Sequence, residues 1–159
     1  MKKLFLTILS MLILGACSSQ PVVSSSKPSS DSKSIQPINP GDSNILVAYF
    51  SVTNNTKTLA EYASEHLGSD IFEIVPKQEY TSQDIDYGSD CRANREQNDD
   101  SARPEIKYQI EDISKYDTIV LGYPIWWSQA PKIMYTFIES YDFTNKTILP
   151  FCTSGSSPI

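Results

Sequence analysis

The chain has 159 residues, which is enough for one ordinary domain with a hydrophobic core. Its formal net charge is −6, and this acidic balance excludes proteins that bind nucleic acid by neutralising phosphates. It contains one histidine, His66, and three cysteines without C-x-x-C spacing. Those counts exclude an ordinary zinc site and a redox-active cysteine pair.

The first 17 residues have the pattern of an export signal. Two lysines precede an apolar run over residues 4–14, which is too short for a membrane-spanning helix. The run ends in LGAC at residues 14–17, which resembles a bacterial lipobox, where the cysteine is lipidated and becomes the new N-terminus. We therefore expect a protein of the cell envelope, outside the cytoplasm and lipid-anchored to a membrane through Cys17. The alternative is an ordinary secretory signal in which Cys17 is incidental.

Residues 18–43 are rich in Ser and Pro and have few large apolar side chains. Such a segment cannot bury enough surface to offset its ordering entropy, so we predict a flexible tether that spans roughly 30 Å. Cleavage before Cys17 would remove two lysines and no acidic residue, changing the formal net charge from −6 to −8. Outside the cytoplasm a disulfide between Cys91 and Cys152 is permitted, although each is more typical of a small buried or half-buried residue.

The folded domain is predicted over residues 44–159. Residues 45–50 (ILVAYF) are apolar throughout and predict a strand buried on both faces. Residues 55–67 predict an amphipathic helix that ends at Gly68 as its C-cap. Residues 70–75 predict a second strand, nearer a sheet edge. The residues of the helix that are expected to face inward are Leu59, Tyr62, Ala63 and Leu67.

The second half of the chain continues the alternation. Residues 76–104 are long, polar and irregular, with a helical piece around residues 90–98. Residues 117–122 and 146–152 predict strands, and residues 129–141 predict a second amphipathic helix. The residues of that helix that are expected to face inward are Ile133, Met134, Phe137 and Ile138.

Strands that alternate with helices predict an α/β sandwich of three layers around a parallel sheet. Ligands of such sheets bind outside the carboxyl ends of the strands, where the strand order reverses. The last predicted strand is followed by a polar, Gly-containing segment that ends at Ile159. A helix would come next in this kind of fold, so we expect a chain that lacks a helix, a last strand and a final helix.

The loop after the first strand is rich in short hydroxyl and amide side chains. At the start of a helix these donors let a phosphate approach free backbone N–H groups and the positive end of the helix dipole. The glycine-rich Walker and dinucleotide motifs are absent. The alternative is that these side chains only cap the helix. The predicted phosphate site consists of Ser51, Thr53, Asn54, Asn55 and Thr56.

The loops after the third and fourth strands differ in character. The third strand leads into PIWWSQAP at residues 124–131, where two adjacent tryptophans point in different directions, so we do not expect both in the core. Their faces suit a flat ligand ring, and packing over the sheet edge is the alternative for each. The fourth strand leads into Thr153, Ser154 and Gly155, whose small size permits close ligand approach or forms a simple turn.

Together the three loops describe a ligand with a phosphate at one end and a planar ring at the other. Over about residues 44–159 the chain resembles the flavodoxin family, and the motifs YFSVTNNT, GYPIWWSQAP and SARPEI carry that resemblance. The resemblance implies a sheet of order 2-1-3-4, with a fifth strand in the family pattern, and FMN as the cofactor. Asn54 and Ser128 stand where glycine is common in the family. The implied FMN-binding residues are Ser51, Thr53, Asn55 and Thr56 for the phosphate, Pro124, Ile125, Trp126 and Trp127 for the isoalloxazine ring, and Thr153, Ser154 and Gly155 for the third loop.

The resemblance further implies electron transfer or oxidoreduction at the outer face of a bacterial membrane. The partner would be a redox protein or a small-molecule electron acceptor. Two alternatives remain open, an NAD(P)H-dependent quinone or flavin reductase and a non-redox binding module that has lost flavin. A serine hydrolase is not supported, because no G-x-S-x-G frame occurs. Arg103 could reach an anionic group near the flavin, although a surface role is the more ordinary interpretation.

Overall fold

The structure is a computed structural model, and it describes residues 44–156. The predicted signal segment, Cys17 and the tether over residues 18–43 lie outside the described residues. Between residues 44 and 156, none of the helices is both long enough and apolar enough to cross a bilayer.

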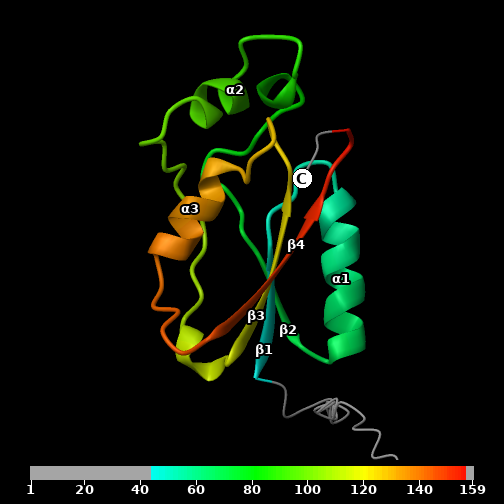
Figure 1. The fold of residues 1–159 in the computed structure, drawn as a ribbon, viewed down its shortest axis with the longest axis vertical. Helices are drawn as coiled ribbons and strands as arrows, with labels where there is room; N and C mark the ends of the chain where they lie inside the picture. Colours follow the sequence, from blue (N-terminus) through cyan, green and yellow to red (C-terminus); the bar gives the residue numbers. More distant parts are fainter. Residues whose placement is uncertain (1–43, 157–159) are drawn as a thin grey trace, which may run out of the picture. The chain divides into compact units, whose positions relative to one another are not determined.

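The sheet is parallel throughout, and its strand order β2-β1-β3-β4 confirms the predicted order (Figure 1). The segment between β2 and β3 carries a helix of six residues, α2, inside the predicted irregular region. The elements in chain order are β1 (Ile45–Tyr49), α1 (Asn55–Leu67), β2 (Asp70–Glu73), α2 (Arg92–Gln97), β3 (Thr118–Pro124), α3 (Lys132–Glu139) and β4 (Thr147–Thr153). Short 3-10 turns cover Gln83–Ile85 and Ile113–Lys115.

The central strand β1 divides the core into two layers. Alternate side chains of a strand point to opposite faces of the sheet. Leu46, Ala48 and Phe50 belong to the buried cluster that also contains residues of α3. Val47 and Tyr49 belong to the cluster that packs against α1. In Figure 1 these helices flank the sheet on opposite sides, so the predicted sandwich of three layers is confirmed.

The inward face of α1 differs from the predicted face. Leu59 and Tyr62 were expected to face the core, but they are 48% and 61% exposed. The fully buried positions are small side chains, Thr56, Ala60 and Ser64. Small side chains let the helix backbone lie close to the sheet, so the large residues are left at the sides of the contact. Ala63 and Leu67 do pack against the core, as predicted.

Helix α3 is shorter at both ends than the helix predicted over residues 129–141, because it begins at Lys132 and ends at Glu139. Pro131 is the N-cap, and a tight turn occupies the preceding residues. Ile133, Met134 and Phe137 are buried as predicted, but Ile138 is 45% exposed, so its predicted inward position is wrong. The two cysteines in the described part of the chain are unpaired thiols, with Cys91 buried and Cys152 half-buried.

Candidate functional site

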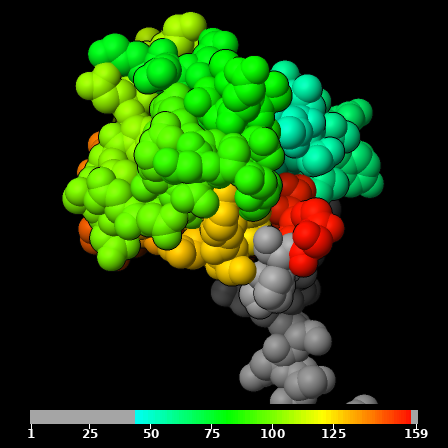
Figure 2. Space-filling view, turned by 90° about the horizontal axis from the view of Figure 1, so that it is seen from above, coloured from blue at the N-terminus to red at the C-terminus, as the bar shows by residue number. Residues whose placement is uncertain are grey.

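The loops after β1, β3 and β4 meet at the carboxyl edge of the sheet. A cavity of about 240 Å³ opens between them, and we call it the site cavity. Figure 2 looks down on this edge and shows the yellow-orange loop after β3 near the red segment at the end of β4. The green segment that follows β2 covers much of the remaining face. The site cavity is lined by Thr53, Asn55, Ile85, Tyr87, Pro124, Ile125, Trp126, Thr153, Ser154 and Gly155.

The first loop begins α1 with an unusual backbone. Asn54 has φ 64° and ψ −2°, the left-handed conformation that glycine adopts most easily and that asparagine tolerates better than most residues. Its side chain makes no capping hydrogen bond to the helix. Because the first turn of α1 contains no carboxylate among its described residues, its N–H groups and dipole stay available to an anion.

A hydroxyl pair joins the first loop to the third. Thr56 is buried, and its Oγ1 lies 2.8 Å from Oγ1 of Thr153 across 97 positions of sequence. The Asn55 amide donates to Oγ1 of Thr53 at 3.3 Å. The pair fixes the start of α1 against the end of β4, so both loops face one space.

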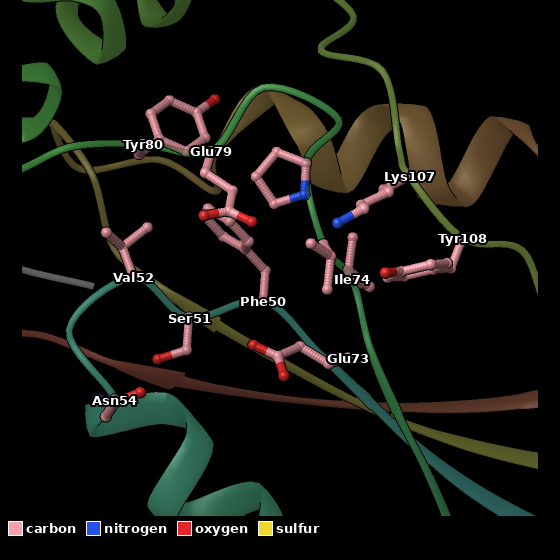
Figure 3. A pocket seen from close by; sticks show the side chains of 12 residues that line it. Phe50, Ser51, Val52, Asn54, Glu73, Ile74, Glu79, Tyr80, Lys107 and Tyr108 are labelled. Atoms are coloured by element: carbon pink, nitrogen blue, oxygen red, sulfur yellow. The ribbon is translucent and has the colours of Figure 1, made fainter.

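Four of the five predicted phosphate residues divide between two cavities, and the fifth, Thr56, is buried and lines neither. Ser51 and Asn54 line a second cavity of about 410 Å³, on the β2 side of β1, rather than the site cavity. Figure 3 shows Glu73, Glu79 and Lys107 directed into that second cavity. Two carboxylates against one ammonium make it unfavourable for a phosphate, whereas the site cavity has no charged lining residue between residues 44 and 156. The charge pattern therefore favours an anion on the Thr53 and Asn55 side.

The two tryptophans have different environments, in agreement with the expectation that they are not both core residues. Trp126 is 6% exposed and packs edge-to-face on Phe50 and Tyr80, with ring centroids 5.4 Å and 5.2 Å away. Trp127 is half-buried and stacks on Tyr87 at 4.2 Å with an interplanar angle of 26°. Trp126 thus forms the floor of the site cavity, and Trp127 lies outside its lining.

A two-residue turn presents Trp127. The backbones of Trp126 and Gln129 exchange two hydrogen bonds of 2.9 Å, and the residues between them have positive φ, 47° at Trp127 and 62° at Ser128. This is the geometry of a type I′ turn, which normally uses asparagine or glycine. Each non-glycine residue in this region costs on the order of 1–2 kcal/mol. Ser128, like Asn54, therefore adopts a backbone conformation that glycine adopts most easily.

Tyr87 and Ile85 are site residues that sequence reasoning missed. Both lie in the irregular segment after β2, and the Tyr87 hydroxyl donates to the Ile125 carbonyl at 3.2 Å. Tyr87 is 54% exposed, and its partial burial moves the pKa of the phenol further above its usual value, away from neutral pH. The signal that could have identified it is the presence of aromatic residues, Tyr80 and Tyr87, within an otherwise polar segment.

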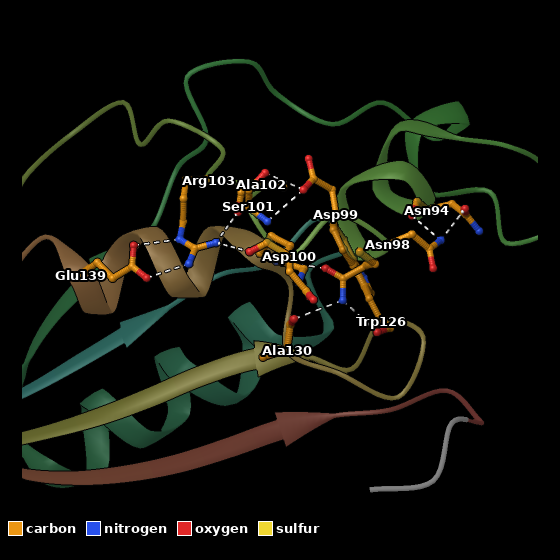
Figure 4. A network of polar contacts seen from close by, with 12 residues as sticks. Asn94, Asn98, Asp99, Asp100, Ser101, Ala102, Arg103, Trp126, Ala130 and Glu139 are labelled. Atoms are coloured by element: carbon orange, nitrogen blue, oxygen red, sulfur yellow. Dashed lines mark hydrogen bonds and ion pairs between the residues drawn. The ribbon is translucent and has the colours of Figure 1, made fainter.

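Arg103 does not reach the site cavity. Its guanidinium forms a two-pronged pair with Glu139 of α3, with both N–O distances 2.8 Å (Figure 4). This geometry agrees with a surface role. His66 is exposed on α1, where Nδ1 lies 2.8 Å from the Tyr62 carbonyl oxygen, and it is not part of the site.

The comparisons with known proteins identify the family of this chain. A family model described as flavodoxin matches residues 44–159. The chain belongs to the flavodoxin family. Among solved structures, it is 47% identical to a candidate flavoprotein from Bacteroides eggerthii, with a TM-score of 0.70 over 71% of this chain and 72% of that one.

Two further structures are similar to this flavodoxin-family chain. A candidate flavoprotein from Bacteroides uniformis is 43% identical, with a TM-score of 0.70 over 72% of this chain and 74% of that one. A flavoprotein from Lactobacillus acidophilus, in complex with FMN, is 24% identical and has a TM-score of 0.57 over 71% of this chain and 76% of that one. A comparison with curated proteins finds no match.

Proposed function

We propose that this chain binds FMN non-covalently in the site cavity and uses it for electron transfer. The observation that carries the proposal is the convergence of three loops on one cavity, with the first and third of them joined by the Thr56–Thr153 hydroxyl pair. The residues present fit a flavin mononucleotide. An uncharged, donor-rich edge meets the start of α1, and aromatic side chains lie at the other end. The FMN complex of the Lactobacillus relative is in keeping with this assignment.

Each loop of the chain has a distinct task in this proposal. Thr53, Asn55 and the first-turn amides of α1 would hold the phosphate by hydrogen bonds rather than by a dedicated lysine. Pro124, Ile125 and Trp126 would shape the space beside the ring, with Tyr87 over it. Small residues after β4 would let the backbone approach the ring. FMN, when bound, supplies the reversible uptake and release of electrons, and the protein supplies placement and electrostatics.

The hydroxyl groups of the first loop provide the direct test. The double variant Thr53→Ala with Thr56→Val removes two hydroxyls and nearly preserves the volume of the buried residue. We expect FMN affinity to fall at least tenfold, measured by fluorescence titration, because the variant loses the Thr53 hydroxyl that lines the site cavity and the Thr56 hydroxyl that joins the start of α1 to Thr153. Thr136→Val is a matched control, since the buried Thr136 hydroxyl has no hydrogen-bond partner and lies on α3. Unchanged affinity in the double variant would refute the phosphate site.

We propose further that the protein passes electrons to a redox partner or a small acceptor, either as an FMN-dependent oxidoreductase or as a pure electron carrier. A reductase oxidises a nicotinamide by itself, whereas a carrier needs a partner protein to supply its electrons. Oxidation of a nicotinamide by the FMN-loaded protein, with no partner protein present, would establish the reductase. A chain that binds no flavin at all would leave the binding-module alternative.

Membrane attachment is a separate proposal. The lysines, apolar run and LGAC sequence of residues 1–17 favour lipidation of Cys17, which would hold the domain at the outer face of a bacterial membrane. Cys17→Ser should move the protein from the membrane fraction to the soluble fraction. Retention of the variant in the membrane fraction would exclude a Cys17 anchor.

A further inference from the structure

Gln97, the last residue of α2, is a buried polar residue that the proposed function does not use. It is 4% exposed, and its side chain makes three hydrogen bonds to the segment from Trp126 to Lys132. Its Nε2 donates to the carbonyls of Trp126 and Ala130, at 3.2 Å each. Its Oε1 accepts from the backbone N–H of Lys132 at 3.0 Å. The dashed lines that end at the Trp126 and Ala130 carbonyls in Figure 4 are two of these bonds.

The three bonded groups bracket the type I′ turn. Trp126 precedes the turn, Ala130 follows it, and Lys132 begins α3. Between them, Trp127 and Ser128 hold a positive φ that bulky side chains rarely adopt. Strained backbone of this kind persists only where its surroundings over-determine it. The Gln97 amide supplies such a constraint, because one rigid group fixes both ends of the turn.

The chemistry of the amide suits this position specifically. Only an amide offers two N–H donors and a carbonyl acceptor in one planar group, and Gln97 uses both kinds. A carboxylate of the same shape could still accept from Lys132 but could not donate to the two carbonyls. A methionine could do neither, and it would leave buried carbonyls without partners.

Helix α2 is itself firmly held, so Gln97 is an anchored support. Its N-terminus is capped by Sγ of Cys91, which accepts from the Asn94 N–H at 3.4 Å. Arg92 pairs with Glu96 at 2.7 Å, and the Tyr80 hydroxyl donates to the same carboxylate. Tyr80 also contacts the Trp126 ring, so this helix and the loop share a packed aromatic boundary.

We propose that Gln97 is a positioning residue, which holds the strained Trp127–Ser128 turn and so keeps Trp127 stacked on Tyr87 beside the site cavity. Its effect on flavin rests on the proposed function, because it reaches FMN only through this loop. Its effect on the Trp127–Tyr87 stack does not depend on flavin. Loss of the Gln97 hydrogen bonds should therefore weaken the Trp127–Tyr87 stack in the apoprotein and also lower the affinity for FMN.

The test uses the full chain, purified in detergent, with Gln97→Met and Gln97→Glu. The stack of Trp127 on Tyr87 should give a near-ultraviolet circular dichroism signal in the apoprotein, identified by its loss in Trp127→Leu. We expect both Gln97 variants to lose at least half of that signal and to bind FMN at least tenfold more weakly. Asn98→Ala is the matched control, because the exposed Asn98 amide bonds only to Asn94 within α2. It should leave both measurements unchanged.

A second variant keeps the test decisive if Gln97→Met fails to fold. Glycine adopts a positive φ without steric cost, so Ser128→Gly removes the strain at one position of the turn. The turn should then depend less on the hydrogen bonds of Gln97. We expect Gln97→Glu to weaken FMN binding by a smaller factor in the Ser128→Gly background than in the wild type. Equal factors, or a folded Gln97 variant with the wild-type signal and affinity, would overturn the proposal. A wild-type chain that binds no FMN would overturn the proposed function, while the apoprotein signal would still decide the role of Gln97.

Discussion

At the scale of single residues, Asn54 decides whether the first loop can form without glycine. It adopts φ 64° and ψ −2° and its side chain caps nothing, so substitutions there test backbone strain almost alone. We expect Asn54→Ala to lower the free energy of unfolding by about 1–2 kcal/mol, because Ala in this region meets the full steric cost. Asn54→Gly should stay within about 0.5 kcal/mol of wild type, since relief of strain offsets a more flexible unfolded chain. Urea denaturation measures both, and equal stability of the two variants would contradict the strain argument.

Residue types in the site were predictable from sequence, but the directions of their side chains were not. A run of hydroxyls and amides after a buried strand predicts donors near the carboxyl edge, and Thr53 and Asn55 do line the site cavity. Ser51 follows the end of β1, where strand alternation no longer applies, and it lines the second cavity instead. Tyr87 could not be placed, because its segment has no periodicity that would bring it to the site.

At the scale of elements, the hydrophobic patterns predicted the four strands and the helices α1 and α3, but not every helix face. The first strand was predicted over residues 45–50 and observed over Ile45–Tyr49, because a short apolar run has few other outcomes beside turn residues. The face of α1 was misjudged, since large apolar residues dominate a pattern whereas small ones, such as Ala60, fit a close helix–sheet contact. In the structure, close packing of α1 against the sheet buries the smaller residues Thr56, Ala60 and Ser64.

The contact between β3 and β4 depends on a glycine. Gly122 pairs with Phe151 in the sheet, and a Cβ at residue 122 would lie 2.3 Å from Cζ of the phenylalanine ring. We expect Gly122→Ala to lower the free energy of unfolding by about 1–3 kcal/mol, because the ring must move from its packed position. Gly155→Ala is the control, since its Cβ would meet no atom within 4 Å. Adding Phe151→Leu should recover part of the loss, and an undiminished loss would show that the ring is not the cause.

Tyr116 links the start of β2 to the residues before β3 and makes stability depend on alkaline pH. Its hydroxyl donates to Asp70 Oδ2 at 2.7 Å. Burial, and then the hydrogen bond to Asp70, raise the pKa of Tyr116 from 10.0 to about 12. A raised pKa stabilises the fold fully below pH 10, and this contribution is lost as pH rises through 12.

The corresponding measurement is urea denaturation as a function of pH. Wild type should lose up to about 2–3 kcal/mol more than Tyr116→Phe as the pH rises through that window, because the variant has no phenol to ionise. At neutral pH the variant should be about 1 kcal/mol less stable, through loss of one hydrogen bond. Parallel pH profiles for the two proteins would exclude this linkage.

At the scale of the whole molecule, the strand order creates the site. With β1 and β3 in the centre, the loops after β1, β3 and β4 end at one edge, and Thr56 meets Thr153 from the far end of the domain. This convergence was predictable, because parallel α/β sheets bind ligands where the strand order reverses. The contributions of Tyr87 and Gln97 were not, because long connections such as residues 74–117 have no fixed path over a sheet edge.

The acidic charge of the whole chain should set the redox potential of the bound flavin. The formal net charge is −6, and the lining of the site cavity has no cation among the described residues to oppose it. A negative field disfavours additional negative charge on reduced FMN, so we expect a midpoint potential below that of free FMN. Salt should raise this potential towards the free value, since the Debye length falls from about 30 Å at 0.01 M to about 3 Å at 1 M ionic strength.

Glu79→Gln, next to the first loop in the second cavity, should shift the potential upward at low salt and very little at high salt. Redox titration at two salt concentrations measures all three effects. A potential above that of free FMN at low salt would mean that local contacts, rather than the charge of the molecule, control the flavin.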